Sequence, residues 1–412
     1  MLNFAAPKRW LPMLASATVL LGCQKESAPE DNTPNLRPLT TTERQTVSST
    51  NDFAYRAFGA LRQASPADNL CISPLSVSAA LTMAYNGADG TTKTAMKQTL
   101  GVASQTDLEI NQSYQSLFSF FTGLDKRVTF SAANSVWYGR QYQLKAPFVQ
   151  ANQTYFGATV QALDFSSPSA KDAINNWVVT NTQGHIPTII DQTSADDVLY
   201  LLNAIYFKGT WTYRFDQALT KPEAFRYADG SSKNVNFMTL RQGRYQLHWD
   251  SQQQVIDLPY GNRQFSMTFI VPQGTATLAE VASRLSSSQL ASWLAKADTT
   301  GTELHVPKFK LDYEQDLNTC LTQLGMGEAF GDQANFSQML AAGPRLKISK
   351  VKHKTFLEVN EEGTEAAAVT SVGMVVTNVG PPAVIRLDRP FLFLLREKST
   401  NTILFMGQVT RP

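Results

Sequence analysis

Residues 199–207, LYLLNAIYF, constrain the fold of this chain more than any other segment. The run is apolar except for Asn203. A strand with one solvated face alternates apolar and polar residues, so a continuous run of this length is typical of a strand covered on both faces. Further strands are predicted for the apolar runs at residues 267–271, 304–309, 391–395 and 403–409.

Helical spacing of apolar residues is clearest in the first half of the chain. It predicts helices at residues 53–61, at 74–84 with Pro74 in the first turn, at 171–182, and at 316–324 before Gly325. Because helices dominate the first part and strands the rest, we expect an α+β fold with large antiparallel sheets. No second linker or repeat follows residue 46, which predicts a single domain over residues 46–412.

The N-terminus has the pattern of an export signal. Lys8 and Arg9 precede the apolar residues 10–22, which are too few to span a bilayer as a helix. The end of this stretch, Leu20-Leu21-Gly22-Cys23, resembles the lipobox of bacterial lipoproteins. That resemblance implies a lipoprotein signal peptide at residues 1–22, lipidation of Cys23 and anchoring in a bacterial envelope, at the outer membrane or cell surface. An ordinary secretory signal is the alternative. Residues 23–45 are expected to be a flexible tether.

Composition argues against a nucleic-acid partner and against a disulfide framework. The 412 residues are 43% hydrophobic and 17% charged, with a formal net charge of +2, so no basic excess favours nucleic acid. Only three cysteines are present, which makes a disulfide framework unexpected. Cys71 and Cys320 lie among apolar residues and are predicted to be small buried side chains.

No catalytic or metal-binding pattern stands out. The four histidines, at positions 185, 248, 305 and 353, form no zinc-binding spacing, and the chain has no Gly-x-Ser-x-Gly elbow. The adjacent carboxylates Asp196-Asp197 and Glu361-Glu362 are typical of charged surface. We therefore expect no metal, no cofactor and no enzymatic activity, although a site assembled from distant residues would leave no local signal.

The most informative segment lies between residues 361 and 382. Read at period two from Thr364, one set of positions is small or apolar throughout, and residues 366–377 contain no charge, proline or aromatic ring. A strand that enters an existing sheet needs these absences, because proline removes a ladder bond and a buried unpaired charge is costly. The local alternative is a helix start, since three alanines follow Glu365.

This segment resembles the hinge of the serpins, a family of protease inhibitors. The match covers ten consecutive positions: Glu361, Glu362, Gly363, Thr364, Glu365, Ala366, Ala367, Ala368, Val369 and Thr370. Other family-like motifs are residues 69–76 (NLCISPLS), 174–177 (INNW), 202–211 (LNAIYFKGTW) and 405–407 (FMG). The resemblance implies a serpin fold with eight to nine helices on three β-sheets and an exposed reactive-centre loop at about residues 361–382.

The resemblance also implies a suicide inhibitor that acts as a monomer and forms covalent complexes with proteases. Counting from the hinge puts the scissile bond between Thr377 and Asn378, with Val376 and Val375 as alternatives, whereas counting from Pro381-Pro382 puts it after Asn378. No Lys or Arg occurs between Thr364 and Ile385, which favours elastase-like and subtilisin-like serine proteases over trypsin-like ones; papain-like cysteine proteases are a further possibility. A non-inhibitory binding module is the alternative function.

Four more residues match positions that the family uses where the main sheet opens. Ser73, Asn203 and His353 are expected to form a polar network near Trp211. Two interpretations remain open: a latch that controls sheet opening, or a structural cluster of satisfied hydrogen bonds.

Overall fold

Helix α1 (Thr41–Ala64) begins at a capping box. The Oγ1 atom of Thr40 accepts a hydrogen bond from the Glu43 N–H, and the Glu43 carboxylate accepts one from the Thr40 N–H. Arg37 binds the same carboxylate and also Ser116. These bonds satisfy backbone donors that a helix start leaves free, so the helix begins inside the predicted tether. The expected boundary at residue 46 is therefore wrong, and ordered contacts begin by Arg37.

The computed structural model describes residues 1–3, 33–364 and 384–412. Contacts group residues 33–412 into one unit. The remaining α-helices of the described ranges are α2 (Pro74–Tyr85), α3 (Gly90–Leu100), α4 (Asp107–Thr122), α5 (Ala146–Phe156), α6 (Pro168–Asn181), α7 (Leu278–Arg284), α8 (Ser287–Ala295) and α9 (Asn318–Leu321). None of the helices described has the length and hydropathy of a membrane span.

The described strands form sheets of seven, four, six and two strands. In the seven-stranded sheet the order is β1 (Leu70–Ile72), β19 (Ile403–Val409), β18 (Phe391–Glu397), β10 (Phe265–Pro272), β9 (Gln253–Tyr260), β8 (Tyr245–Trp249) and β11 (Asp298–Thr300). In the four-stranded sheet it is β17 (Val384–Arg386), β12 (Glu303–Pro307), β7 (Ser232–Leu240) and β6 (Lys221–Arg226). In the six-stranded sheet it is β13 (Phe309–Asp316), β15 (Lys352–Val359), β16 (Gly363–Thr364), β5 (Leu199–Thr210), β2 (Val128–Gly139) and β4 (Thr159–Leu163). The two-stranded sheet pairs β14 (Leu340–Ala342) with β3 (Gln143–Leu144).

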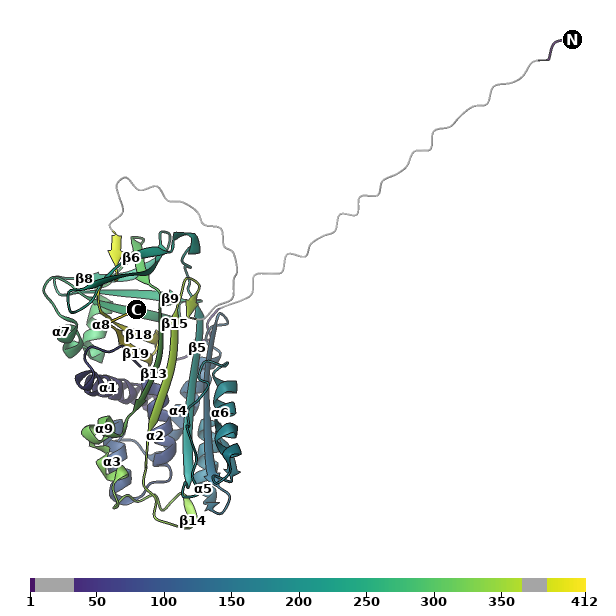
Figure 1. Ribbon diagram of the computed structural model, residues 1–412, viewed down its shortest axis with the longest axis vertical. Coiled ribbons are helices and arrows are strands. Elements are labelled where there is room, and N and C mark those ends of the chain that lie inside the picture. Colours follow the sequence, from purple (N-terminus) through teal and green to yellow (C-terminus); the bar gives the residue numbers. More distant parts are fainter. Residues whose placement is uncertain (4–32, 365–383) are drawn as a thin grey trace. The chain divides into compact units, whose positions relative to one another are not determined.

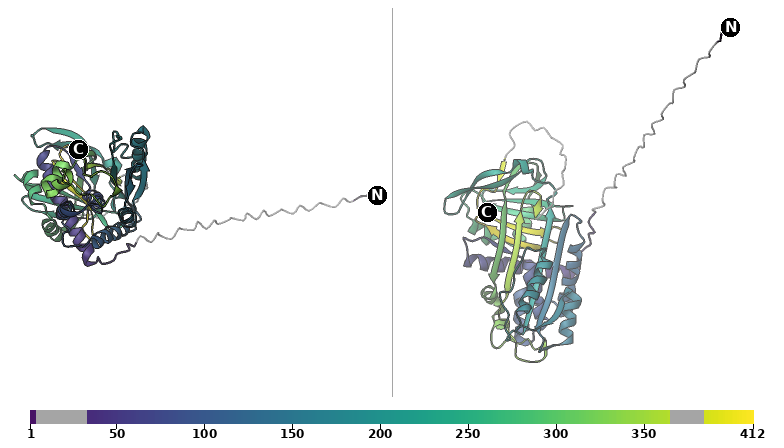
Figure 2. Two further views of the ribbon diagram at one scale, coloured as in Figure 1. Left: turned by 90° about the horizontal axis from the view of Figure 1, so that it is seen from below. Right: turned by 45° about the vertical axis from the view of Figure 1, so that its right-hand side comes forward.

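The apolar run at residues 199–207 lies in β5 and is covered on both faces, as predicted. Helix α6 packs on one face, where Ile174 and Val178 join Trp137 of β2 in a separate apolar cluster. Helix α2 packs against β5 from within the main core. Figure 1 shows α6 and α2 on either side of the long strands, and the turned views of Figure 2 show those strands running side by side. The α+β expectation is confirmed.

Two predicted elements are not single elements in the structure. The run 304–309 belongs to two strands of two sheets, because β12 ends at Pro307 and β13 begins at Phe309. The helix predicted at 316–324 is only α9 followed by a wider turn, Thr322–Met326, and Asp316 instead pairs with Lys352 in a β-ladder. In both cases long-range strand pairing overrides the local pattern.

Two of the three cysteines are described, and both are buried and free. Burial raises the pKa of the Cys71 thiol to about 12 and that of Cys320 to about 11. Because the thiolate is the reactive form, both are inert core side chains, as predicted. Cys23 lies outside the described residues.

Candidate functional site

The short strand β16 lies between β15 and β5 at one end of the six-stranded sheet. Thr364 pairs with Val359 on one side and with Gly209 on the other. Beyond β16, the described parts of β15 and β5 pair only with their outer neighbours, β13 and β2. At Thr364 the two strands therefore lie two strand spacings apart, about 9–10 Å between the backbones. Further along, no described residue pairs with the edges of β15 and β5 that face each other.

Gly363 is required by the geometry at the start of this strand. Its φ angle is +153°, in the region that L side chains rarely adopt. A Cβ atom at this position would lie 1.9 Å from the carbonyl oxygen of Gly209. Only glycine allows the backbone to approach β5 so closely.

Thr364 is buried, and its hydroxyl lies 2.7 Å from the hydroxyl of Tyr260. Tyr260 stacks on Trp211, with ring centroids 4.2 Å apart and planes inclined by 13°. Burial raises the pKa of Tyr260, which keeps its hydroxyl protonated. The indole Nε1 of Trp211 in turn donates to the carbonyl of Asn360 at 2.9 Å. The inner face of β16 thus lies against a rigid aromatic platform.

Glu361 is held by an ion pair on the chain just before β16. Its carboxylate lies 2.8 Å from the Lys308 ammonium and accepts a 2.8 Å hydrogen bond from Thr220. Burial alone would raise the pKa of Glu361, but the bonds from Lys308 and Thr220 hold it below its ordinary value. The backbone N–H of Phe215 donates to the Glu361 carbonyl as well, so this approach to the gap is firmly anchored.

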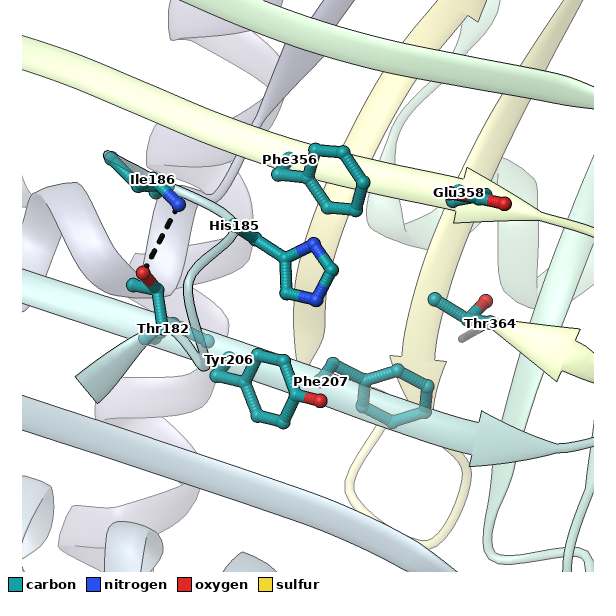
Figure 3. A pocket seen from close by; sticks show the side chains of 9 residues that line it. Thr182, His185, Ile186, Tyr206, Phe207, Phe356, Glu358 and Thr364 are labelled. Atoms are coloured by element: carbon teal, nitrogen blue, oxygen red, sulfur yellow. Dashed lines mark hydrogen bonds between the residues drawn. The ribbon is translucent and has the colours of Figure 1, made fainter. Parts of the chain in front are cut away.

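A pocket continues the gap directly beside Thr364. It has an empty volume of about 340 Å³, counting its open mouth, and is lined from β15 by Phe356 and Glu358, from β5 by Tyr206 and Phe207, and by His185. Figure 3 shows the two strands on opposite sides of it, with Thr364 at one end. The pocket therefore lies on the line along which β16 would continue between β15 and β5.

Comparison with known proteins decides the family. A family model described as Serpin (serine protease inhibitor) matches residues 48–412. Serpin B10 of Sorex araneus is 32% identical over 394 residues, which cover 89% of this chain and 99% of that protein. The chain belongs to the serpin family.

Two further similarities agree with this assignment. The leukocyte elastase inhibitor of Sus scrofa is 33% identical over 380 residues, covering 89% of this serpin and 100% of that protein. Human thyroxine-binding globulin in complex with thyroxine matches with a TM-score of 0.82 at 29% identity, covering 90% of this serpin and 99% of that chain. The expected serpin fold is confirmed, and with it membership of a family whose members are in general protease inhibitors rather than enzymes.

The four residues predicted to surround the opening of the sheet do not form one cluster. The backbone N–H of Ser73 donates to Nε2 of His353 at 3.0 Å, and the Ser73 hydroxyl donates to the Leu404 carbonyl. Asn203 donates from its amide to Asn134 of β2 at 2.6 Å. Counting back six residues from Val359 and from Gly209 puts His353 and Asn203 at the same level on opposite sides of the gap.

Trp211 is the residue that the prediction misplaced. It lies eight residues beyond Asn203, or about 26 Å along an extended chain, at the β16 end of the gap. The expectation that the polar residues lie near Trp211 is therefore wrong, because β5 is long enough to separate them. Trp211 instead belongs with Tyr260 and Asn360.

His353 is neutral in this environment. Burial lowers its pKa to about 4, and its Nε2 atom accepts the hydrogen bond from Ser73. A neutral imidazole that accepts at Nε2 carries its proton on Nδ1.

Several predicted site residues lie outside the described ranges. They are the later hinge positions Glu365, Ala366, Ala367, Ala368, Val369 and Thr370, and the reactive-bond candidates Val375, Val376, Thr377 and Asn378. Conversely, the structure brings to the site residues that sequence reasoning missed, namely Tyr260, Lys308 and Gly209. Tyr260 and Lys308 contact residues 104 and 53 positions away, so no local pattern could have indicated them.

Proposed function

We propose that this serpin is a suicide inhibitor of proteases, which traps its target by inserting the segment after Thr364 into the six-stranded sheet. The observation that supports the proposal is the position of β16 between β15 and β5 at one end, with no other described residue paired to the edges of these strands that face each other. Two strands that already hold two residues of a strand between them are a template for addition of more of that strand.

The register of β16 indicates how far such a strand can extend. Continued residue by residue, it places residue 371 opposite Lys352, where β15 begins, so seven residues after Thr364 would pair with both neighbours. A central strand makes about two ladder bonds per residue, each contributing about 0.5–1.5 kcal/mol net, which sums to the order of 10 kcal/mol. The absence of charge, proline and aromatic rings from residues 366–377 suits this position.

The proposed chemistry is that of an interrupted proteolysis. The nucleophile of the protease attacks the carbonyl of Thr377, the Thr377–Asn378 peptide bond breaks, and the new amino group leaves on Asn378. Insertion of the loop then carries the acylated protease away before water cleaves the ester. The residues before the bond, Met374 to Thr377, favour elastase-like or subtilisin-like targets, and papain-like enzymes second.

Incubation with one protease from each class, followed by denaturing gels and intact-mass spectrometry, tests the proposal. We expect an adduct of the summed mass that survives boiling in detergent, and a released fragment that begins at Asn378. Cleavage without an adduct by every protease would refute the inhibitory function and favour the non-inhibitory binding module.

We also propose that the chain is exported, processed before Cys23 and anchored by a lipid on that residue, with the folded unit acting as a monomer. The apolar stretch before Cys23 and its lipobox-like end support this. Metabolic labelling with a fatty acid tests it: the label should enter the intact sequence and be lost in Cys23→Ala. Equal labelling of both would refute lipidation at Cys23.

A further inference from the structure

His185 reaches the gap from a tight turn after α6. The residues before it, Gln183 and Gly184, have φ angles of +53° and +85°. The N–H of His185 donates to the Thr182 carbonyl at 3.0 Å, and the next N–H, of Ile186, donates to the Thr182 hydroxyl at 3.1 Å. This turn therefore fixes where the imidazole points.

The imidazole bridges the two strands that border the gap. Its centroid lies 4.4 Å from the ring of Phe356 on β15, with planes inclined by 29°, and 6.2 Å from the ring of Tyr206 on β5, inclined by 21°. Figure 3 shows the ring between these two side chains, on the way from Thr364 into the gap. Stacked rings attract each other beyond the area they bury, so this contact joins β15 to β5.

The register of β16 indicates which residue of a continued strand would lie next to the imidazole. Phe356 and Tyr206 lie three residues back from Val359 and Gly209, and paired residues in a sheet point to the same face. A strand continued in this register would place Ala367 between Phe356 and Tyr206, on the face where His185 stacks. Alanine has only a methyl group, the smallest side chain that an L-residue can bring beneath the ring.

We propose that His185 is a positioning residue for strand insertion, a brace that holds β15 and β5 in place and slows the advance of the hinge beyond Thr364. The inference rests on the proposed insertion mechanism and adds to it the element that resists insertion. Loss of the ring is expected to let a strand enter the gap sooner, while a flat apolar ring at the same position should preserve the resistance.

The test follows entry of a strand without any protease. A fluorescent synthetic peptide with the sequence of residues 364–377 is mixed with the full, uncleaved protein, and its incorporation is followed by anisotropy. We expect His185→Ala to take up the peptide about five to ten times faster than the unsubstituted protein, since two ring contacts are lost. His185→Phe should stay within about twofold, and so should the control Asn176→Ala on the exposed side of α6.

Phe356→Leu removes the partner ring from β15 and provides a second route to the same result. It should accelerate uptake as His185→Ala does. Equal rates in both variants and in the unsubstituted protein would overturn the role of His185 and leave strand insertion standing. Failure of every form to take up the peptide would overturn strand insertion, and the brace with it.

Thermal unfolding separates a brace from a general structural contact. His185→Ala should lower the unfolding midpoint of the uncleaved protein but leave that of the loop-cleaved protein unchanged, because the inserted strand then joins β15 to β5. An equal decrease in both forms would show that the imidazole contributes only ordinary packing, and would refute the proposal.

Discussion

Replacement of Thr364 by arginine is the sharpest perturbation of the proposed mechanism. Thr364 is 3% exposed, lies in a strand position between β15 and β5, and shares a hydrogen bond with Tyr260. An arginine there would bring a guanidinium against the Tyr260–Trp211 platform. The hinge would leave the gap instead, and the rest of the protein should keep its fold because β16 contributes only two residues to the sheet.

The size of the effect follows from burial of an unpaired charge. Such a charge costs about 3–5 kcal/mol in proteins. If insertion must pass through this state, its rate falls about 10²- to 10⁴-fold, since each 1.36 kcal/mol corresponds to a factor of ten. The rate of deacylation should not change, so the acyl-enzyme should be hydrolysed before the loop inserts.

The assay is the stoichiometry of inhibition, measured by titrating a fixed amount of an inhibited protease. Thr364→Arg should be cleaved as a substrate with almost no stable complex, while Thr364→Ser, which retains the hydroxyl, should behave like the unsubstituted protein. Stable complexes formed by Thr364→Arg at the original stoichiometry would refute the reasoning that the hinge enters the sheet at Thr364.

Three further predictions concern the residues around the gap. Gly363→Ala should lower the free energy of unfolding by about 1–3 kcal/mol in a denaturant titration, because its Cβ would clash with Gly209; an unchanged midpoint would contradict this. Lys308→Met should destabilise the uncleaved protein by about 1–3 kcal/mol by leaving the buried Glu361 carboxylate without its ammonium partner, and Lys308→Arg, which keeps the charge, is the control. Because the folded protein lowers the pKa of His353 from 6.5 to about 4, the unfolded chain takes up the proton first as the pH falls. The free energy of unfolding should therefore decrease by up to about 3 kcal/mol between pH 6.5 and 4. If the free energy of unfolding of His353→Asn changed with pH in parallel with that of the unsubstituted protein, this histidine would not be the cause.

Local features of the fold could be read directly from neighbouring residues. Pro74 marks the first turn of α2, and the apolar run of β5 predicts a strand covered on both faces. Helix α1 begins earlier than the apolar spacing at residues 53–61 predicts, because the capping box at Thr40 and Glu43 depends on two polar side chains and not on apolar content. Such patterns depend only on residues a few positions apart, so they can be recognised without knowing the rest of the fold.

The order of the strands in the sheets could not be predicted from local patterns in the sequence. The apolar residues 304–309 look like one strand, but the chain passes from one sheet to another at Lys308. Which strand pairs with which is decided by total burial and ladder bonding over the whole domain, and a local window contains neither.

By itself, the sequence determined the chemical character of the hinge: Gly363, the small residue Thr364 and a glutamate, followed at residues 366–377 by a stretch without charge, proline or aromatic ring. Only the tertiary structure decided what surrounds it. It brought Tyr260 to Thr364, Lys308 to Glu361, and the imidazole of His185 between Phe356 and Tyr206. These partners are distant in sequence and meet because strands of three different parts of the chain pack around β16, between β5 and β15, which is a property of the packed sheets and of no single segment.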